Sequence, residues 1–209
     1  MEKIKELIKN ISEKDYEEKK ANLHIHTSCS DGDGNYKQIL ESAKEKQYKL
    51  IAITDHNTVE AHKNINDEIL LTGAEFDCWC GYVYIHLLAY GIDINNKDLQ
   101  KFLAKNKAET EGVLIRLFCK RNIKELINAI HNAGGIAVLA HPACYWALNL
   151  ENLVKKLITY GLDGIEVYYP YPRFRKVVKF HTSSDVKKIA EKYPELIKTG
   201  GTDFHGKTF

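Results

Sequence analysis

Short apolar, β-prone runs recur along this chain, and several of them end in histidine, aspartate or glutamate. Residues 50–54 lead into Asp55 and His56, and residues 136–140 lead into His141. Runs of this length and composition are typical of buried strands. Folds built from parallel strands gather the strand carboxyl ends at one edge, so the polar residues that follow them converge. We therefore expect a fold that brings these side chains into one site.

The runs expected to form strands lie at residues 22–26, 50–54, 69–73, 82–90, 136–140, 164–168 and 196–199. Helical patterns lie between several of them, at residues 36–46, 122–132, 150–160 and 184–192. Glycines follow two of these patterns, as is common at helix C-termini. The alternation of strand and helix predicts a parallel α/β architecture, either a barrel or a doubly wound sheet. Residues 97–120 are the least regular stretch and are expected to be helical.

A single domain is expected at residues 21–209, preceded by a helical extension at residues 1–20. The extension is rich in Lys and Glu, and its apolar residues have helical spacing. No apolar run has the length of a membrane span, and the N-terminus lacks the pattern of a signal peptide. Five scattered cysteines fit free thiols better than a disulfide framework, so a cytoplasmic protein is expected. The net charge of +2 argues neither for nor against a nucleic-acid partner.

The clearest chemical pattern is the His-x-His of Leu23-His24-Ile25-His26. Residues i and i+2 of a strand point to the same face, so His24 and His26 would project together, with Ile25 on the other side. Two parallel imidazoles can chelate a metal ion, although two polar residues on a half-exposed strand would give the same pattern. Asp203 and His205 repeat the spacing near the end of the chain.

The strand ends together deliver more ligands than one tetrahedral zinc ion can use. We therefore predict two or three divalent cations. Mixed imidazole and carboxylate ligands suit manganese, zinc or iron, and the sequence does not choose among them. The predicted ligands are His24, His26, Asp31, His56, Glu75, His86, His141, Asp203 and His205. By contrast, His62 and His131 fall in helical patterns, where surface positions are expected.

The ordered motifs H-x-H, S-D-G, T-D-H-N, G-x-E, H, H-P and G-T-D-F-H resemble those of the polymerase and histidinol phosphatase (PHP) family of phosphoesterases. The resemblance covers roughly residues 21 to 206. It implies a distorted seven-stranded (β/α)7 barrel, similar to a TIM barrel, with a trinuclear metal centre. Compared with small phosphoesterases of this kind, the chain has little room after Arg116 for a helical insertion, which suggests an open site.

The resemblance also implies a division of the ligands among the cations. The first cation would be held by His24, His26, Glu75 and Asp203, the second by Glu75, His86 and His141, and the third by Asp31, His56 and His205. Asp55 and Glu166 match positions that support these ligands from behind.

The predicted activity is hydrolysis of phosphomonoesters or phosphodiesters, including those of nucleotides or short oligonucleotides. A metal-activated hydroxide would attack phosphorus in line, so no nucleophilic Ser or Cys is needed. Positive side chains that could hold a substrate phosphate are Arg116, Arg173, Arg175 and His181, although a solvated surface also explains the arginines.

Two alternatives stay open from the sequence. A histidinol-phosphate phosphatase would share the metal ligands and differ in its substrate. A non-catalytic metal-binding domain would keep the fold without the reaction, although the complete ligand set argues against it.

Overall fold

The computed structural model describes residues 1–118, 120–170 and 180–209. The strands are β1 (Ala21–Ile25), β2 (Leu50–Ile53), β3 (Leu70–Leu71), β4 (Gly73–Cys80), β5 (Val83–Tyr90), β6 (Ile136–Leu139), β7 (Gly164–Tyr168) and β8 (Ile197–Gly200). The α-helices are α1 (Glu2–Lys9), α2 (Glu13–Glu17), α3 (Tyr36–Glu45), α4 (Lys97–Gln100), α5 (Ala108–Glu111), α6 (Val113–Phe118), α7 (Ile123–Asn132), α8 (Leu150–Thr159) and α9 (Ser183–Lys192). Two short 3-10 helices, η1 (Glu60–Asn64) and η2 (Pro142–Cys144), follow β2 and β6.

The sheets mix parallel and antiparallel pairing, so the expectation of a purely parallel arrangement is wrong for the middle of the chain. β1, β2 and β3 pair in parallel, as do β6, β7 and β8. β5 is antiparallel to both β4 and β6. Gly81 has φ +67°, which permits a tight turn that joins β4 directly to β5 without a crossover helix. β4 is a strand that the sequence pattern did not predict, since the expected strands ended at residue 73 and began again at residue 82.

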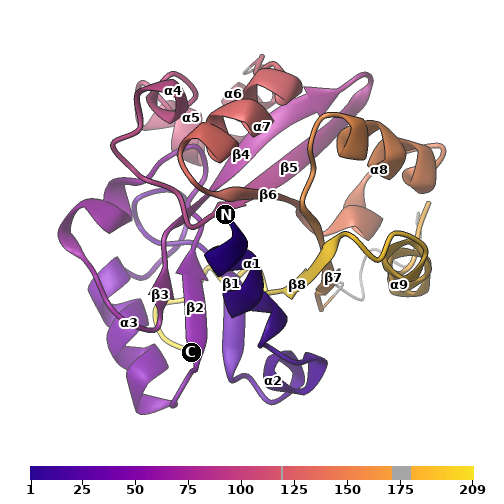
Figure 1. Ribbon diagram of the computed structural model, residues 1–209. Coiled ribbons are helices and arrows are strands. Elements are labelled where there is room, and N and C mark those ends of the chain that lie inside the picture. The colour runs from indigo at the N-terminus through magenta and orange to yellow at the C-terminus, as the bar shows by residue number, and fades with distance from the viewer. Residues whose placement is uncertain (119, 171–179) are drawn as a thin grey trace.

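A continuous closed barrel is likewise not present in the described residues. The strands form one sheet of order β1-β2-β3 and another of order β4-β5-β6-β7-β8. Isolated bridges join the two sheets, between Ile25 and Phe204 and between His56 and Glu75. At both places the chain has left regular strand structure to present the histidine and carboxylate side chains. The result is a mixed α/β fold in which strands surround α1 and the larger helices lie outside (Figure 1).

One end of the interior between the strands is filled by a cluster of apolar side chains. Leu88, Tyr90 and Val138 are fully buried there with residues of β2 and β8. Ile8 of α1 is also fully buried in this cluster, which fixes α1 across the ring of strands (Figure 1). A separate apolar layer lies between the strands and the outer helices. The cluster of histidine and carboxylate side chains therefore occupies the part of the interior that these apolar side chains do not fill.

His62 is buried and not on the surface, contrary to expectation. Its Nε2 lies 2.9 Å from the carbonyl oxygen of Ile53 and 3.1 Å from the backbone nitrogen of Gly73. It thus links β2 to the start of β4. His131 is partly exposed and lies 2.7 Å from Asp163.

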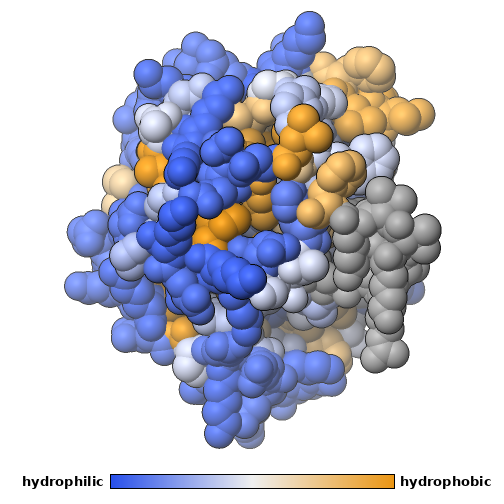
Figure 2. Space-filling view, turned by 90° about the vertical axis from the view of Figure 1, so that its right-hand side faces the viewer, coloured by the Kyte–Doolittle hydropathy of each residue, from blue (hydrophilic) through white to orange (hydrophobic). Residues whose placement is uncertain are grey.

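The outer surface is largely hydrophilic on the face drawn in Figure 2, with hydrophobic residues gathered toward its upper right. Among the described residues, no helix combines the length and the apolar character that a membrane span requires.

Candidate metal centre

Strand alternation on β4 separates the site from the outer core. Glu75 and Asp77 face the interior, whereas Phe76 between them joins the apolar layer under the outer helices. His24 of β1 and His26, which directly follows β1, face the interior, and Ile25 packs with Ile39 of α3. The predicted two-residue spacing therefore places the paired histidines as expected.

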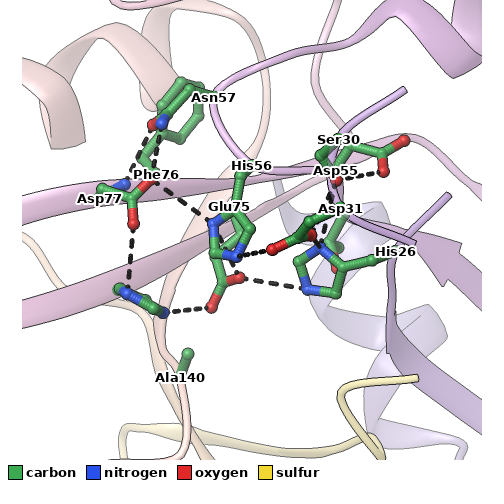
Figure 3. A network of polar contacts seen from close by, with 12 residues as sticks. His26, Ser30, Asp31, Asp55, His56, Asn57, Glu75, Phe76, Asp77 and Ala140 are labelled. Atoms are coloured by element: carbon green, nitrogen blue, oxygen red, sulfur yellow. Dashed lines mark hydrogen bonds and ion pairs between the residues drawn. The ribbon is translucent and has the colours of Figure 1, made fainter. Parts of the chain in front are cut away.

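Glu75 is the centre of the site. It is 1% exposed and lies within 3.3 Å of ring nitrogens from five histidines. Its Oε1 is near His24 (3.3 Å), His86 (2.9 Å) and His141 (3.3 Å), and its Oε2 is near His26 (3.2 Å) and His56 (3.3 Å). Figure 3 shows the contacts of Glu75 with His26 and His56. These rings come from four separate parts of the chain, so the fold itself assembles the cluster.

The structure brings all the predicted ligand residues together. Groups whose candidate ligand atoms lie within 4.8 Å of one another are His24, His26, Glu75 and Asp203; Glu75, His86 and His141; and His26, Asp31, His56 and His205. His26 belongs to two groups, because its Nδ1 faces Asp31 at 3.4 Å and its Nε2 faces Asp203 at 3.2 Å. A fourth group contains His56, Asp77 and His86, and was not predicted from the sequence because Asp77 was not a candidate ligand.

Two buried carboxylates support the predicted ligand residues through hydrogen bonds, either directly or through the loop that carries them. Glu166 lies 3.1 Å from Nδ1 of His24 and accepts a 2.7 Å hydrogen bond from the backbone N–H of His141. Asp55 makes no hydrogen bond or ion pair with a histidine among the residues that the structure describes. It accepts hydrogen bonds from the N–H (2.6 Å) and hydroxyl (2.7 Å) of Thr27 and from the hydroxyl of Ser30 (2.7 Å; Figure 3). Asp55 therefore fixes the loop that carries His26 and Asp31.

The backbone around the ligands is unusual for non-glycine residues. His141 has φ +23° and Asp203 has φ +51°, in or near the left-handed region that L-residues rarely adopt. A Cβ at Gly201 would lie 2.3 Å from Cβ of His24, so only glycine allows this close approach. Backbone strain of this kind concentrates at functional sites, where surrounding contacts enforce it.

The charges in the cluster strongly perturb one another. Burial on its own would lower the pKa of His26 and His141, but neighbouring carboxylates and hydrogen bonds outweigh it, and the pKa values rise to about 9 and about 10. Burial would likewise raise the pKa of Glu75, but the adjacent imidazoles His86, His24 and His56 hold that pKa well below its usual range. The site is thus a compact, largely buried cluster of imidazole and carboxylate side chains that perturb one another's pKa values.

The residues fit divalent cations. Several buried ring and carboxylate atoms lack a hydrogen bond of acceptable geometry within the described structure: Nε2 of His24 and His26, Nδ1 of His56 and His141, and Oε2 of Glu75. A buried polar atom without a partner is costly, and a cation would satisfy several of these atoms at once. Imidazole and carboxylate donors are the ligands that zinc, manganese and iron accept.

The candidate phosphate contacts have different surroundings. Arg116 is 5% exposed, its Nη1 is 3.3 Å from Asp31, and its Nε lies 3.9 Å from Asp77. His181 places Nε2 2.6 Å from the carbonyl oxygen of Ala147, so this nitrogen binds the loop after η2. Arg173 and Arg175 lie outside the described residues.

Two further side chains lie at the site and were not among the predicted ligands or phosphate contacts. Asp77 is fully buried, and two-residue spacing from Glu75 on the same strand was the available signal. Tyr169 donates a 3.1 Å hydrogen bond to Asp203, and its ring centroid lies 5.5 Å from that of His141. No metal-ligand spacing pointed to Tyr169, because it acts through a neighbour.

Buried clusters of histidine and carboxylate side chains that could hold several cations, set in a mixed α/β fold, are typical of metal-dependent hydrolases. The sequence model of the PHP domain matches residues 22–201, and the chain belongs to this family of metal-dependent phosphoesterases.

Related proteins agree with this assignment. Phosphoribosyl 1,2-cyclic phosphate 1,2-diphosphodiesterase of Eggerthella lenta is 24% identical over 88% of this chain and 94% of its own length. The 5'-3' exoribonuclease Rnm of Escherichia coli is 29% identical over 68% of this chain and 55% of its own length.

Solved structures share the fold. An amidohydrolase from Chromobacterium violaceum has a TM-score of 0.69 with 18% identity, covering 90% of this chain and 88% of that chain. A protein of Bifidobacterium adolescentis assigned as a metal-dependent phosphoesterase has a TM-score of 0.67 with 22% identity over the same shares.

Proposed function

We propose that this protein hydrolyses phosphate esters of nucleotides or short oligonucleotides with the help of two or three divalent cations. The observation that carries the proposal is the set of five imidazoles around the buried carboxylate of Glu75. The substrate class is supported by two relatives, a cyclic phosphoribosyl phosphodiesterase and an exoribonuclease. Both act on esters of sugar phosphates, a chemistry that this chain would share.

In this proposal the cations are held by the three groups of ligands expected from the sequence. Glu75 is shared by the first two groups and supplies the negative charge that neutral imidazoles lack. Glu166 orients His24 by accepting the proton of its Nδ1, which leaves Nε2 for a cation. Asp55 serves the third group by holding the loop that carries Asp31.

When bound, divalent cations supply Lewis acidity: they neutralise phosphate charge and lower the pKa of water toward neutrality. The chain adds a positive charge of its own through Arg116, whose buried guanidinium lies beside Asp31 and can bind a phosphate oxygen. Cys29 is not suited to be a nucleophile, because burial raises the pKa of its thiol. This supports a mechanism without a covalent enzyme intermediate.

Metal removal tests the proposal directly. We expect protein reconstituted with Mn²⁺ to hydrolyse 4-nitrophenyl phosphate or bis(4-nitrophenyl) phosphate. Dialysis against a chelator should lower the rate on the order of 100-fold or more, since the cations carry several kcal/mol of transition-state stabilisation. Release of nitrophenol, followed before and after adding Mn²⁺ back, is the measurement. A rate that chelation leaves unchanged would exclude a metal-dependent reaction.

The alternatives are separated by substrate. Nucleoside 3',5'-bisphosphates, short oligoribonucleotides and histidinol phosphate would be compared in parallel with the same Mn²⁺-loaded protein. A strong preference for histidinol phosphate would replace the proposed substrate class. Tight cation binding without hydrolysis of any phosphate ester would indicate a non-catalytic domain.

Cation binding should also release protons near neutral pH. His26 and His141 have pKa values of about 9 and about 10, so both rings are protonated at pH 7 before a cation binds. A ring must be neutral to bind metal, so each of these protons must leave. We therefore expect apparent affinity to rise as pH increases from 7 toward 9. Calorimetric titration in buffers of different ionisation enthalpy counts the protons, and a count of zero would contradict the assigned ligands.

A further inference from the structure

Asp77 sits at the meeting point of two groups of candidate ligands. It follows Glu75 by two residues on β4 and has 0% exposure. Each of its oxygens faces one neutral donor and one histidine nitrogen. The Oδ1 contacts are the hydroxyl of Tyr84 (2.5 Å) and Nε2 of His86 (3.2 Å), and the Oδ2 contacts are Nδ2 of Asn57 (2.5 Å; Figure 3) and Nδ1 of His56 (3.5 Å).

Both histidines turn their other ring nitrogen toward the predicted cation ligands. Nδ1 of His86 lies 2.9 Å from Glu75, and Nε2 of His56 lies 3.7 Å from Asp31. Each ring therefore lies between Asp77 on one side and a cation group on the other. His86 would serve the second cation, and His56 the third.

Elementary imidazole chemistry decides what Asp77 does there. A neutral imidazole has one nitrogen that carries a proton and one that can bind a cation. If a further cation bound between His56, Asp77 and His86, both rings would have to lose their last proton as well. A carboxylate also has about four acceptor positions. Tyr84 and Asn57 donate to two of them, and Nε2 of His86, Nδ1 of His56 and Nε of Arg116 lie 3.2, 3.5 and 3.9 Å from the carboxylate oxygens. Asp77 is thus better suited to accept protons than to bind a metal.

We propose that Asp77 is a positioning residue that accepts the Nε2 proton of His86 and the Nδ1 proton of His56, and so aims the opposite nitrogen of each ring at a cation. The proposal rests on the proposed metal-dependent function. Nδ1 of His56 lies 3.3 Å from Glu75 and 3.5 Å from Asp77 and makes no hydrogen bond of good geometry with either carboxylate before a cation binds. Since Glu75 is committed to two cations in that function, Asp77 is the acceptor that remains for this proton.

The surroundings hold Asp77 rigidly enough for this role. Asn57 makes two hydrogen bonds with Asp77. Its Oδ1 accepts a 3.1 Å hydrogen bond from the backbone N–H of Asp77, and its Nδ2 donates to the Asp77 carboxylate. Arg121 donates a 3.1 Å hydrogen bond to the backbone carbonyl of Asp77. A fixed carboxylate shared by two rings couples the second and third cation positions to each other.

Asp77→Asn tests the inference with little change in shape. The amide replaces one oxygen with a donor, so it can accept from only one of the two rings, and the other ring must move its proton to the nitrogen that binds a cation. We expect Mn²⁺ affinity at one position to fall about 10- to 100-fold, as for other supporting partners of metal ligands. The number of ions bound at saturation should stay the same. Equilibrium dialysis against graded Mn²⁺ with elemental analysis measures both.

A second readout needs no metal. Nitrogen-15 NMR of the cation-free protein should show a tautomer change in His56 or His86 of Asp77→Asn. Tyr84→Phe, which removes a donor to Asp77 and keeps both ring contacts, should give a smaller loss of affinity. Asp163→Asn is the matched control, because Asp163 is a buried partner of His131 and Lys5 outside the centre. It should lower thermal stability and leave Mn²⁺ affinity unchanged.

Unchanged tautomers and unchanged affinity in Asp77→Asn would overturn the inference. Loss of one whole ion at saturation, with the affinity of the others intact, would overturn it too, since Asp77 would then be a ligand of a separate cation. If the wild-type protein binds no cation, the proposed function fails. The NMR result then still decides whether Asp77 sets the tautomers.

Discussion

Glu75→Gln is expected to lose phosphoesterase activity on the order of 1000-fold and to bind fewer cations. A thousandfold change in rate corresponds to about 4 kcal/mol of transition-state stabilisation, and the cations that Glu75 would hold supply several kcal/mol of it. Glu75 faces ring nitrogens of five histidines. In Glu75→Gln an amide NH₂ group would replace one carboxylate oxygen, and this group can neither bind a cation nor accept a proton from a ring. Hydrolysis rate and metal content per chain measure the loss.

The control for this substitution is Glu151→Gln on the surface. Glu151 pairs with Lys155 and Lys192, which are both half exposed, and such pairs contribute little. Its rate and metal content should match those of the wild-type protein. If Glu75→Gln kept a full complement of cations and most of its activity, Glu75 could not be the shared ligand. The division of the cluster into three cation positions would then have to be redrawn.

The strands and helices could largely be predicted, because their apolar spacing is regular. The patterns at residues 36–46 and 122–132 correspond to α3 (Tyr36–Glu45) and α7 (Ile123–Asn132). The topology was harder. Residues 73–90 contain two antiparallel strands joined by a two-residue turn, and an apolar run alone does not reveal a reversal of direction. The gaps in barrel closure depend on tertiary geometry that no local pattern encodes.

The site could be predicted in its composition but not in its connections. His24 and His26 follow from strand periodicity, and predicted strands that lead into His, Asp or Glu supplied most of the remaining candidates. Asp77 was missed because no strand was predicted at residues 74–80, so its two-residue spacing from Glu75 gave no sign of a shared face. His62 was misplaced because a histidine in a helical pattern is usually exposed, whereas here it joins two strands. For both residues, the contacts that decide their position are made with residues far away in the sequence, which a local pattern does not identify.

Phe76→Ala is expected to destabilise the fold strongly without removing the metal centre. Phe76 is fully buried in the apolar layer outside the strands, and truncating such a side chain costs about 3–5 kcal/mol. For a chain of this size the melting temperature should fall by roughly 6–20 °C. Differential scanning calorimetry measures this fall. At a temperature where the variant is folded, its Mn²⁺ content should equal that of the wild-type protein, because Glu75 and Asp77 point the other way.

The contrast between adjacent positions makes this a test of how β4 is oriented. Val113→Ala, an exposed substitution on α6, should change stability by less than about 0.5 kcal/mol and serves as the control. If Phe76→Ala melted like the wild-type protein, residue 76 would not lie in the core. If the folded variant lost its cations, Phe76 would face the site and the alternation on β4 would be reversed. Loss of stability without loss of cations is the result that places the apolar core and the metal ligands on opposite faces of β4.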